Sequence, residues 1–360
     1  MNNIICPNKE CKSHLQPEAP APKIKQYQGK LKPIALLQCK TCRTLFSERN
    51  GTVYFGLKRS PDDFDQVIQL AVCRVSIRDI TRITGISEDT IQRWLKKAAD
   101  FLGPLHDSLV HDLEISECQV DELWSFVLMK KKTALLQGKE DILDIGDQWV
   151  FIAIDAVNKL VVHWKIGKRT LETAKVFIAE LKGKLKSAPL FTTDEWRGYE
   201  EAFLANFCSL ETPEPEPVKK RGRPRTKQNR TPNDDLKLAQ VHKHRKQGKV
   251  IKITEKIIFG DPAVIQEILD HSSVSNRINT SIVERSNGTL RAKVSRVVRE
   301  TYSFSKSLEM HAAHLTIYFV YYNLIWLHSR LKKTAAWLSG LLSRPYSFRE
   351  LFEMRVPNWV

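Results

Sequence analysis

The sequence contains no long apolar stretch. Its longest apolar-looking run, Leu315–Leu327, has 13 residues and includes Thr, Asn and three Tyr, whereas a membrane-spanning helix needs about 20 residues. The first residues, MNNIICPNKECK, lack the apolar core of a signal peptide. We therefore expect a cytoplasmic, nucleoid-associated protein whose seven cysteines form no disulfides in a reducing compartment.

Acidic residues are few relative to basic ones. The 360 residues include 41 Asp and Glu against 57 Lys and Arg, a formal net charge of +16. Hydrophobic content of 42% and charged content of 27% are ordinary for a globular protein, so global disorder is excluded. An excess of positive charge indicates a polyanionic partner, and without a membrane segment we expect double-stranded DNA.

Four of the seven cysteines form two close pairs, Cys6 with Cys11 and Cys39 with Cys42. Two such knuckles, joined by a hairpin of about 25 residues, supply the four thiolates of a structural zinc ribbon. The spacing of the first pair is longer than the common CxxC. The alternative is four unrelated thiols. We predict a zinc ribbon over residues 1–56 with these four cysteines as Zn²⁺ ligands.

Residues 57–112 contain the start and stop signals of three short helices. Ser60-Pro61 begins the first, Ser76 begins the second, and Gly85 separates the second from a third that starts after Ser87. A helix, a glycine turn and a further helix match a helix-turn-helix, although a plain helical connector has the same pattern. The isoleucines at 77, 80, 83, 86 and 91 are expected in the core. The third helix would offer DNA contacts from Gln92, Arg93, Lys96 and Lys97.

A different pattern starts near Ser116. Strand-like segments at 117–127, 149–155 and 160–166 precede a helix at 170–185 and a strand at 189–194. This order, followed by a distant helix, is what a ribonuclease-H-like mixed sheet requires. The predicted fold is thus an α/β catalytic core after a zinc ribbon and a helix-turn-helix domain.

Three acids in this region are candidate ligands of two catalytic metal ions. Asp121 lies within the first strand, Asp194 ends the fourth, and Glu284 lies on the distant helix, where they could converge on two Mg²⁺. Asp155 also ends an apolar strand, but a turn follows it, where Asp is common. The alternative for each acid is a solvated surface carboxylate. The residues expected beside a DNA backbone on the distant helix are Arg285, Asn287 and Arg291.

Five segments resemble the insertion-sequence-one family of prokaryotic DDE transposases. They read CQVDELWSFV, TLETAKVFIAEL, FTTDEWRGYE, NTSIVERSNGTLRAKVSR and YSFSKSLEMHAAHLTIYFVYYNL. The resemblance implies a ribonuclease-H-like fold with Asp121, Asp194 and Glu284 as the DDE residues. It also implies Mg²⁺ or Mn²⁺ dependence, recognition of terminal inverted repeats, and transfer of a 3′-OH strand end into target DNA.

A basic segment separates Asp194 from Glu284. Residues 218–252 hold 13 Lys and Arg against two Asp, and we assign residues 211–252 as an insertion. Within it an Arg-Gly-Arg-Pro sequence resembles an AT-hook, which inserts arginines into a narrow A·T minor groove. A solvated basic loop that binds phosphates without preference is the alternative. The proposed minor-groove contacts are Arg221, Gly222, Arg223, Pro224 and Arg225.

The expected organisation is completed by a catalytic domain at 113–330 and a helical tail at 331–360. The aromatic-rich helix at 303–327 is expected to pack against the catalytic sheet. The function predicted is a DNA transposase acting as a dimer or higher oligomer on DNA. The alternatives are a transposase-derived DNA-binding regulator without catalysis and a ribonuclease-H-like nuclease or resolvase.

Overall fold

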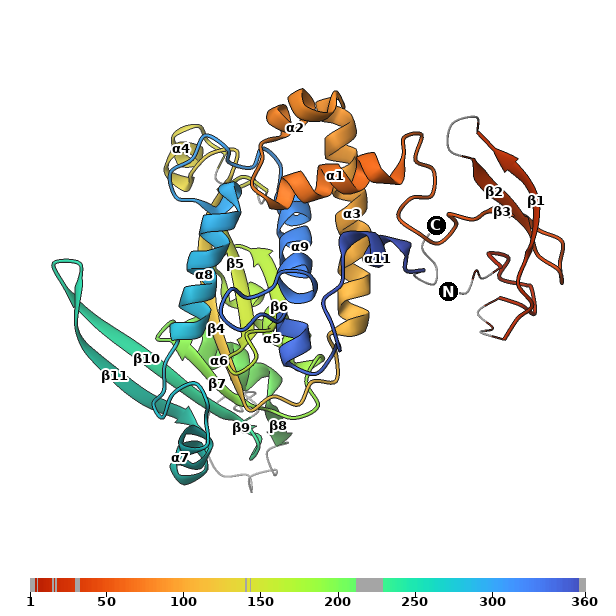
Figure 1. The fold of residues 1–360 in the computed structure, drawn as a ribbon. Coiled ribbons are helices and arrows are strands. Elements are labelled where there is room, and N and C mark those ends of the chain that lie inside the picture. The colour runs from red at the N-terminus through yellow and green to blue at the C-terminus, as the bar shows by residue number, and fades with distance from the viewer. Residues whose placement is uncertain are drawn as a thin grey trace, which may run out of the picture. The chain divides into compact units, whose positions relative to one another are not determined.

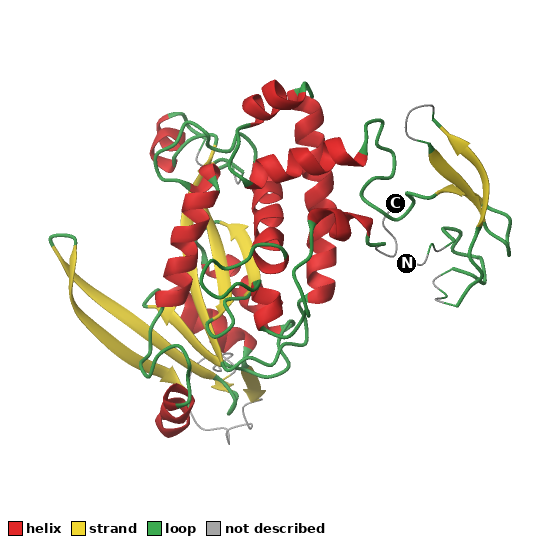
Figure 2. Ribbon diagram, viewed as in Figure 1, coloured by secondary structure: helices red, strands yellow, loops and turns green. Residues whose placement is uncertain are grey.

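The computed structural model describes residues 4, 6–14, 16, 18–29, 33–139, 141–142, 144–211 and 229–355. The chain divides into two compact units. The first comprises residues 1–109, 309–337 and 343–360, and the second comprises residues 110–308 and 338–342. Figure 1 labels the elements in chain order, and Figure 2 distinguishes helices from strands by colour. Within the described ranges, no helix combines the length and apolarity needed to cross a bilayer.

The first unit begins with a small three-stranded antiparallel sheet beside the four cysteines. Its strands, in the order β1-β2-β3, are Lys23–Gln28, Ile34–Gln38 and Leu45–Ser47. Ala35, Leu37 and Phe46 pack with the cysteines in a small core. A four-cysteine cluster near a small antiparallel sheet is therefore present, as the cysteine spacing predicted.

Three helices follow with the boundaries that the capping residues predicted. They are α1 Pro61–Val72, α2 Ile77–Thr84 and α3 Glu88–Leu109. Ser60 forms a capping box with Asp63, and Gly85 ends α2 in the left-handed conformation at φ 67°. Ile80 and Ile91 are buried, but Ile83 is 57% exposed, so its predicted place in the core is wrong.

The first unit also contains elements from the distant C-terminal region. These are α9 Leu308–Leu324, whose first residue falls in the second unit, α10 Ala335–Leu338, whose last residue does likewise, and α11 Phe348–Glu353. Asn323 on α9 hydrogen-bonds His106 on α3 at 2.8 Å, and Phe352 on α11 packs 5.3 Å from Phe64 on α1, centroid to centroid. The aromatic helix, predicted to pack against the catalytic sheet, thus groups with the N-terminal helices over residues 309–324.

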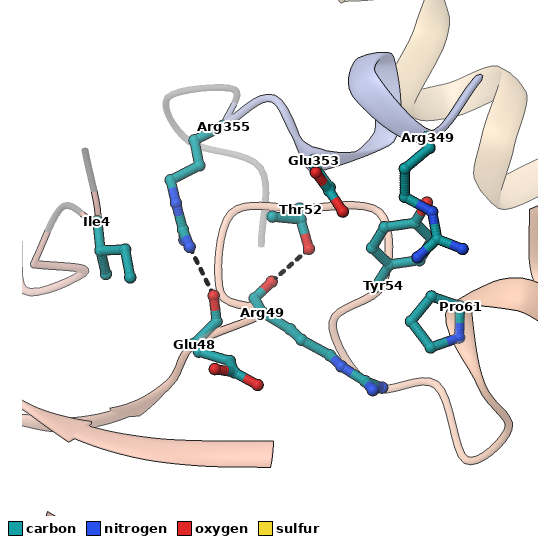
Figure 3. Close-up of a pocket in the computed structure, with 9 residues that line it drawn as sticks. All are labelled: Ile4, Glu48, Arg49, Thr52, Tyr54, Pro61, Arg349, Glu353 and Arg355. Atoms are coloured by element: carbon teal, nitrogen blue, oxygen red, sulfur yellow. Dashed lines mark hydrogen bonds between the residues drawn. The ribbon is translucent and has the colours of Figure 1, made fainter. Parts of the chain in front are cut away.

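Two arginines attach the α11 segment to the N-terminal residues. Figure 3 shows a cavity of about 480 Å³ in which Arg355 donates to the Glu48 carbonyl oxygen. In the same view Arg349 lies beside the Tyr54 ring, 5.3 Å from its centroid. Arg349 also pairs with Asp62 and Asp65, each at 2.6 Å. The predicted tail at 331–360 is therefore partly an integral element of this unit.

The second unit is built on a six-stranded mixed sheet in the order β11-β10-β7-β4-β5-β6. β4 Glu117–Val127 is antiparallel to β5 Gly146–Asp155, which is antiparallel to β6 Val161–Gly167. β4 is parallel to β7 Leu190–Asp194, and β7 is parallel to β10 Lys237–Lys246. β10 and β11 Lys249–Phe259 form an antiparallel hairpin that extends beyond the rest of the sheet (Figure 1).

Helices and short strands complete this unit. They are α4 Lys131–Leu136, α5 Leu171–Lys182, α6 Arg197–Asn206, α7 Pro262–Asp270, α8 Ser281–Lys293 and the 3₁₀ turn η1 Ser295–Val297. A two-stranded sheet pairs β8 Cys208–Glu211 with β9 Asn229–Pro232. The helix α8 packs against β4 and β5, whereas α5 packs against α6 and against β5 and β6. The mixed α/β architecture predicted from the sequence is confirmed.

Candidate active site

Three carboxylates cluster where β4 passes the end of β7. Asp121 and Glu122 lie within β4 and Asp194 is the last residue of β7. One oxygen from each lies within 4.8 Å of the others, close enough to share a metal ion. The parallel pairing of these two strands brings Asp121 and Asp194 together, as their neighbouring positions predicted. Glu122 was not predicted as a member of the site.

The buried amide of Gln119 fixes α8 against β4. Its Oε1 accepts hydrogen bonds from the backbone amides of Ile282 at 2.9 Å and Val283 at 3.0 Å. Its Nε2 donates to Asn279 Oδ1 at 3.2 Å. The first amides of a helix lack partners within the helix, so a strand residue that accepts from two of them sets the helix position. Because Asp121 follows two residues later on the same face of β4, α8 is aligned with that carboxylate.

Glu284, the third predicted acid, borders the same space as the other two. Asp121, Asp194 and Glu284 all line one cavity of about 510 Å³. The Glu284 carboxylate accepts from Thr280 Oγ1 at 2.6 Å and pairs with Lys243 of β10. It is not part of the compact group formed by Asp121, Glu122 and Asp194. The structure thus brings the predicted trio to one cavity, with Glu284 held at its side by a lysine.

The other face of β4 holds Glu122 in a polar cage. Tyr199 Oη of α6 donates to Glu122 Oε2 at 2.7 Å. Arg169 pairs with Glu122 and lies 3.7 Å from Asp194 Oδ2. Its guanidinium is stacked 5.0 Å from the ring centroid of Trp149 and 4.8 Å from that of Trp196. Stacking between two indoles holds the arginine in place while leaving its charge beside the acids.

Burial and mutual repulsion make these acids weak. Desolvation, then the charges of Glu122 and Asp194, raise the pKa of Asp121 to about 7. Desolvation and the charge of Asp194 raise the pKa of Glu122 to about 7. Burial also raises the pKa of Asp194. Carboxylates that resist ionising together are relieved by a cation, which is the electrostatic property of a metal site.

Two buried polar atoms near Asp121 have no hydrogen-bond partner among the described residues. Asn287 is 6% exposed and donates from Nδ2 to Asp121 Oδ2 at 2.8 Å, while its Oδ1 has no partner. One helical turn on, Arg291 Nε is likewise unpartnered. Arg285 is exposed. Of the α8 residues predicted to lie beside DNA, Asn287 points toward Asp121, whereas Arg285 is exposed to solvent.

Asp155, the competing acid, occupies a turn. It is fully buried and its Oδ1 accepts from the backbone amides of Val157 at 2.9 Å and Asn158 at 3.2 Å. The Asn158 side chain donates to the other oxygen at 2.8 Å. These contacts are those of an acid that closes a tight turn. The turn position predicted for Asp155 is confirmed.

The four cysteines form a second centre. Their sulfur atoms all lie within 4.8 Å of one another, with Cys6 3.5 Å from Cys42 and Cys11 3.9 Å from Cys39. The amide of Ser13 donates to Cys11 Sγ at 3.4 Å. Hydrogen bonds that involve Thr44 lower the pKa of Cys42 to about 6. Four converging thiols with an amide donor are a donor set that suits Zn²⁺.

The predicted DNA contacts of α3 divide into two pairs. Gln92 and Arg93 are exposed. Lys96 instead pairs with Glu309, and Lys97 is half-buried and donates to the Phe55 carbonyl oxygen. The five residues of the predicted AT-hook, 221–225, lie outside the described residues.

Comparison with known families identifies one segment of the chain. Residues 253–323 match the family model of the IS1 transposase. This stretch is similar to IS1 transposases. It contains α8 with Glu284, Asn287 and Arg291, whereas Asp121 and Asp194 lie outside the match. No curated protein matches the chain. The resemblance seen in the sequence is confirmed over this segment.

Proposed function

We propose that the chain is a DDE transposase whose active site is formed by Asp121, Asp194 and Glu284. The observation that carries this proposal is their convergence on one cavity from two neighbouring strands and a helix. The sheet order β6-β5-β4-β7-β10, with helices on both sides of β4, supports a ribonuclease-H-like core. In such a core the acids reach the cavity from separate elements and can share a pair of cations.

The residues present fit Mg²⁺ or Mn²⁺. Hard cations prefer oxygen ligands, and the cavity provides carboxylates whose mutual repulsion Arg169 and Lys243 offset only in part. Beside them lies Asn287 Oδ1, which has no partner among the described residues. Bound there, the ions would supply activation of the attacking oxygen and stabilisation of the leaving oxygen. Asp121 and Asp194 would hold them together with Glu284. Glu122 is already bound by Tyr199 and Arg169. Its role would be to neutralise Arg169 and hold it in position.

The remaining side chains would hold the DNA. Lys243 and Arg245 line the cavity beside the acids, and Arg291 lies one turn from Asn287. Their positive charges would hold the scissile phosphate and offset charge in the transition state. Asp121, Asp194 and Glu284 provide no covalent intermediate in this scheme. Water attacks the phosphodiester at the element end, and the freed 3′-OH then attacks target DNA.

The first unit would recognise the ends of the element. The four cysteines would hold a structural Zn²⁺ in a zinc ribbon, and α2 and α3 would bind terminal inverted repeats as a helix-turn-helix, with Gln92 and Arg93 exposed for contact. We assign residues 1–56 and 57–112 to these modules and the catalytic function to residues 113–308 of the predicted 113–330 domain, since residues 309–337 group with the first unit. Two ends must meet for transposition, so the active form would be a dimer or higher oligomer on DNA.

A cleavage and joining assay tests the proposal. Purified protein with Mg²⁺ or Mn²⁺ is expected to nick end-containing DNA and to join the 3′-OH to a target. Asp121→Ala should abolish both steps, whereas Asp235→Ala, which removes an exposed acid before β10, should leave them intact. Nicking without joining would favour a nuclease or resolvase. Equal DNA binding with no chemistry in any variant would favour a regulator.

A further inference from the structure

The β10–β11 hairpin is the outer edge of the six-stranded sheet. β10 pairs with β7 and with β11, whereas β11 pairs with β10 alone. The two strands are joined by Gln247 and Gly248, both with positive φ, at 51° and 78°. A two-residue turn of this kind makes a tight, regular hairpin. The hairpin is therefore an ordered two-stranded ribbon.

The base of the β10–β11 hairpin lines the acidic cavity, and its tip carries lysines that form no ion pair with the described residues. Near the base, Lys243 pairs with Glu284 and His242 contacts Glu195, while Arg245 also lines the acidic cavity. Farther out, three exposed lysines make no ion pair with any residue that the structure describes. They are Lys246, Lys249 and Lys252. A line of positive charge thus runs from the acidic cavity toward the hairpin tip.

The ribbon also exposes aliphatic side chains between its lysines. Val250, Ile251 and Ile253 on β11 are 43%, 63% and 56% exposed. A shift in register next to Arg245 leaves Ile251 unpaired across the hairpin. Lysines on an edge strand oppose pairing with a second sheet. Positive charge around an aliphatic centre therefore favours an anionic, grooved partner over a second copy of the chain.

We propose that the tip of the β10–β11 hairpin binds duplex DNA as a two-stranded ribbon lying in a groove. The major groove admits a two-stranded ribbon, its flanking phosphates would face the tip lysines, and aliphatic side chains can contact base edges or base steps. The inference rests on the proposed function only in assigning the acidic cavity to DNA chemistry. The ribbon would hold the duplex that enters this cavity, so it adds a DNA contact separate from the N-terminal helices.

Charge removal at the tip is the first test. The triple variant Lys246→Gln, Lys249→Gln, Lys252→Gln is titrated with a fluorescent 30-base-pair duplex by anisotropy at several salt concentrations. We expect at least a tenfold weaker affinity near 0.1 M salt and a salt slope reduced by about 2 to 3, since each phosphate contact contributes about 0.9. The control is the triple variant Lys175→Gln, Lys182→Gln, Lys186→Gln on and after α5, which should bind as the parent does. Equal affinity and slope in the tip variant and the parent would overturn the proposal.

Removal of the aliphatic side chains is the second test. Ile251→Ser with Ile253→Ser should weaken duplex binding at an unchanged salt slope, because it removes apolar contacts and no charge. Loss of self-association in light scattering, with DNA affinity intact, would assign the surface to a second copy instead. Asp235→Ala, at an exposed acid outside the hairpin, should retain full DNA affinity. Absence of DNA cleavage by the parent protein would contradict the proposed active site. Weaker DNA binding by the tip variants would support the proposed role of the hairpin.

Discussion

Asn287 donates a hydrogen bond of 2.8 Å to Asp121, and its other amide atom is buried without a partner among the described residues. This contact links α8 to β4 at the carboxylate on which the proposed chemistry depends. Since a small displacement of a reacting group can lower a rate by about 100-fold, the side chain that orients Asp121 should matter for rate as well as for stability.

Asn287→Ala is expected to lower the rate of end cleavage by about 10-fold to 100-fold, since Asp121 loses its donor. Weaker binding of Mn²⁺, measured by calorimetry or paramagnetic relaxation, should accompany the loss. Thr289→Ala changes the same helix at a side chain that bonds only the Arg285 carbonyl oxygen, and it should behave as the parent does. If both variants cleave at the parental rate, Asn287 has no positioning role.

Asp121→Asn should stabilise the protein when no divalent cation has been added. The raised pKa of Asp121, about 7, means that the folded state holds a proton that the unfolded state releases near pH 4. The contribution of Asp121 to parental stability therefore falls as pH rises from about 4 to about 7, and the variant escapes this loss. At pH 8 we expect a gain on the order of 2 to 4 kcal/mol, read from thermal or denaturant unfolding.

The same variant should lose its response to Mn²⁺. Added Mn²⁺ is expected to raise the parental unfolding temperature but not that of Asp121→Asn. Asp235→Asn, at an exposed acid, should match the parent at every pH and respond to Mn²⁺ as the parent does. A stability difference between the parent and Asp121→Asn that stays constant from pH 4 to pH 8 would contradict the raised pKa of Asp121.

Gly198 leaves room for the indole that supports Arg169. A Cβ at this position would lie 2.5 Å from Trp196 Cζ2, a distance that forces the ring to move. Gly198→Ala should therefore cost roughly 1 to 3 kcal/mol of stability, change tryptophan fluorescence and slow cleavage. Gly288→Ala is the matched control, because nothing lies within 4 Å of its Cβ and α8 should gain about 0.5 to 1 kcal/mol. Equal fluorescence in the two variants would refute the packing argument.

The four-cysteine centre should contain one zinc ion per chain. Cys39→Ser is expected to abolish stoichiometric zinc, measured by plasma emission, and to unfold the small sheet, since structural zinc sites fold with their metal. Cys73→Ser changes an exposed cysteine outside the cluster and should retain the metal. Parent protein purified without zinc, yet with an ordered ribbon by NMR, would show that the thiols alone suffice.

Arg349 neutralises a buried acid. Its Nε lies 2.6 Å from Asp65, whose other oxygen accepts from Tyr54 at 2.7 Å. Arg349→Met would leave Asp65 buried without its cation, and we expect a loss of about 3 kcal/mol in chemical denaturation. Arg344→Met breaks an exposed pair with Glu350 and should cost less than about 1 kcal/mol. Comparable losses in the two variants would mean that burial of Asp65 does not decide the cost.

The local signals of the first three helices could be predicted well, because capping chemistry depends only on neighbouring residues. Ser60 and Gly85 mark helix ends wherever the helices pack. Ile83 was misplaced because spacing by three residues falls 60° short of a full turn at each step, so 77, 80 and 83 cannot share one face. The sequence shows that Ile83 is apolar, but it does not show which face of α2 packs against the neighbouring helices.

The acids show the same division. Asp121 and Asp194 followed from strand order, whereas Glu122 could be recognised only after Tyr199 and Arg169 were seen against it. The β11 strand was missed because both of its faces are exposed along most of its length, so charged and aliphatic residues show no buried alternation. The first residues of its partner β10 are buried, and the hairpin could be recognised only once β10 was seen to pair with β7.

The packing of α11 among the first helices also bears on how the protein forms in the cell. A ribosome finishes α1–α3 long before residues 348–355, which contribute Phe352 and Arg355 to that unit. Nascent domains ordinarily fold from the N-terminus as they emerge. Here α1–α3 are completed by residues that are translated only after the whole of residues 110–308. A polypeptide that stops short of α11 would expose the apolar groups around Phe64 and present a target for degradation, so only a chain translated through the second unit would keep an intact first unit.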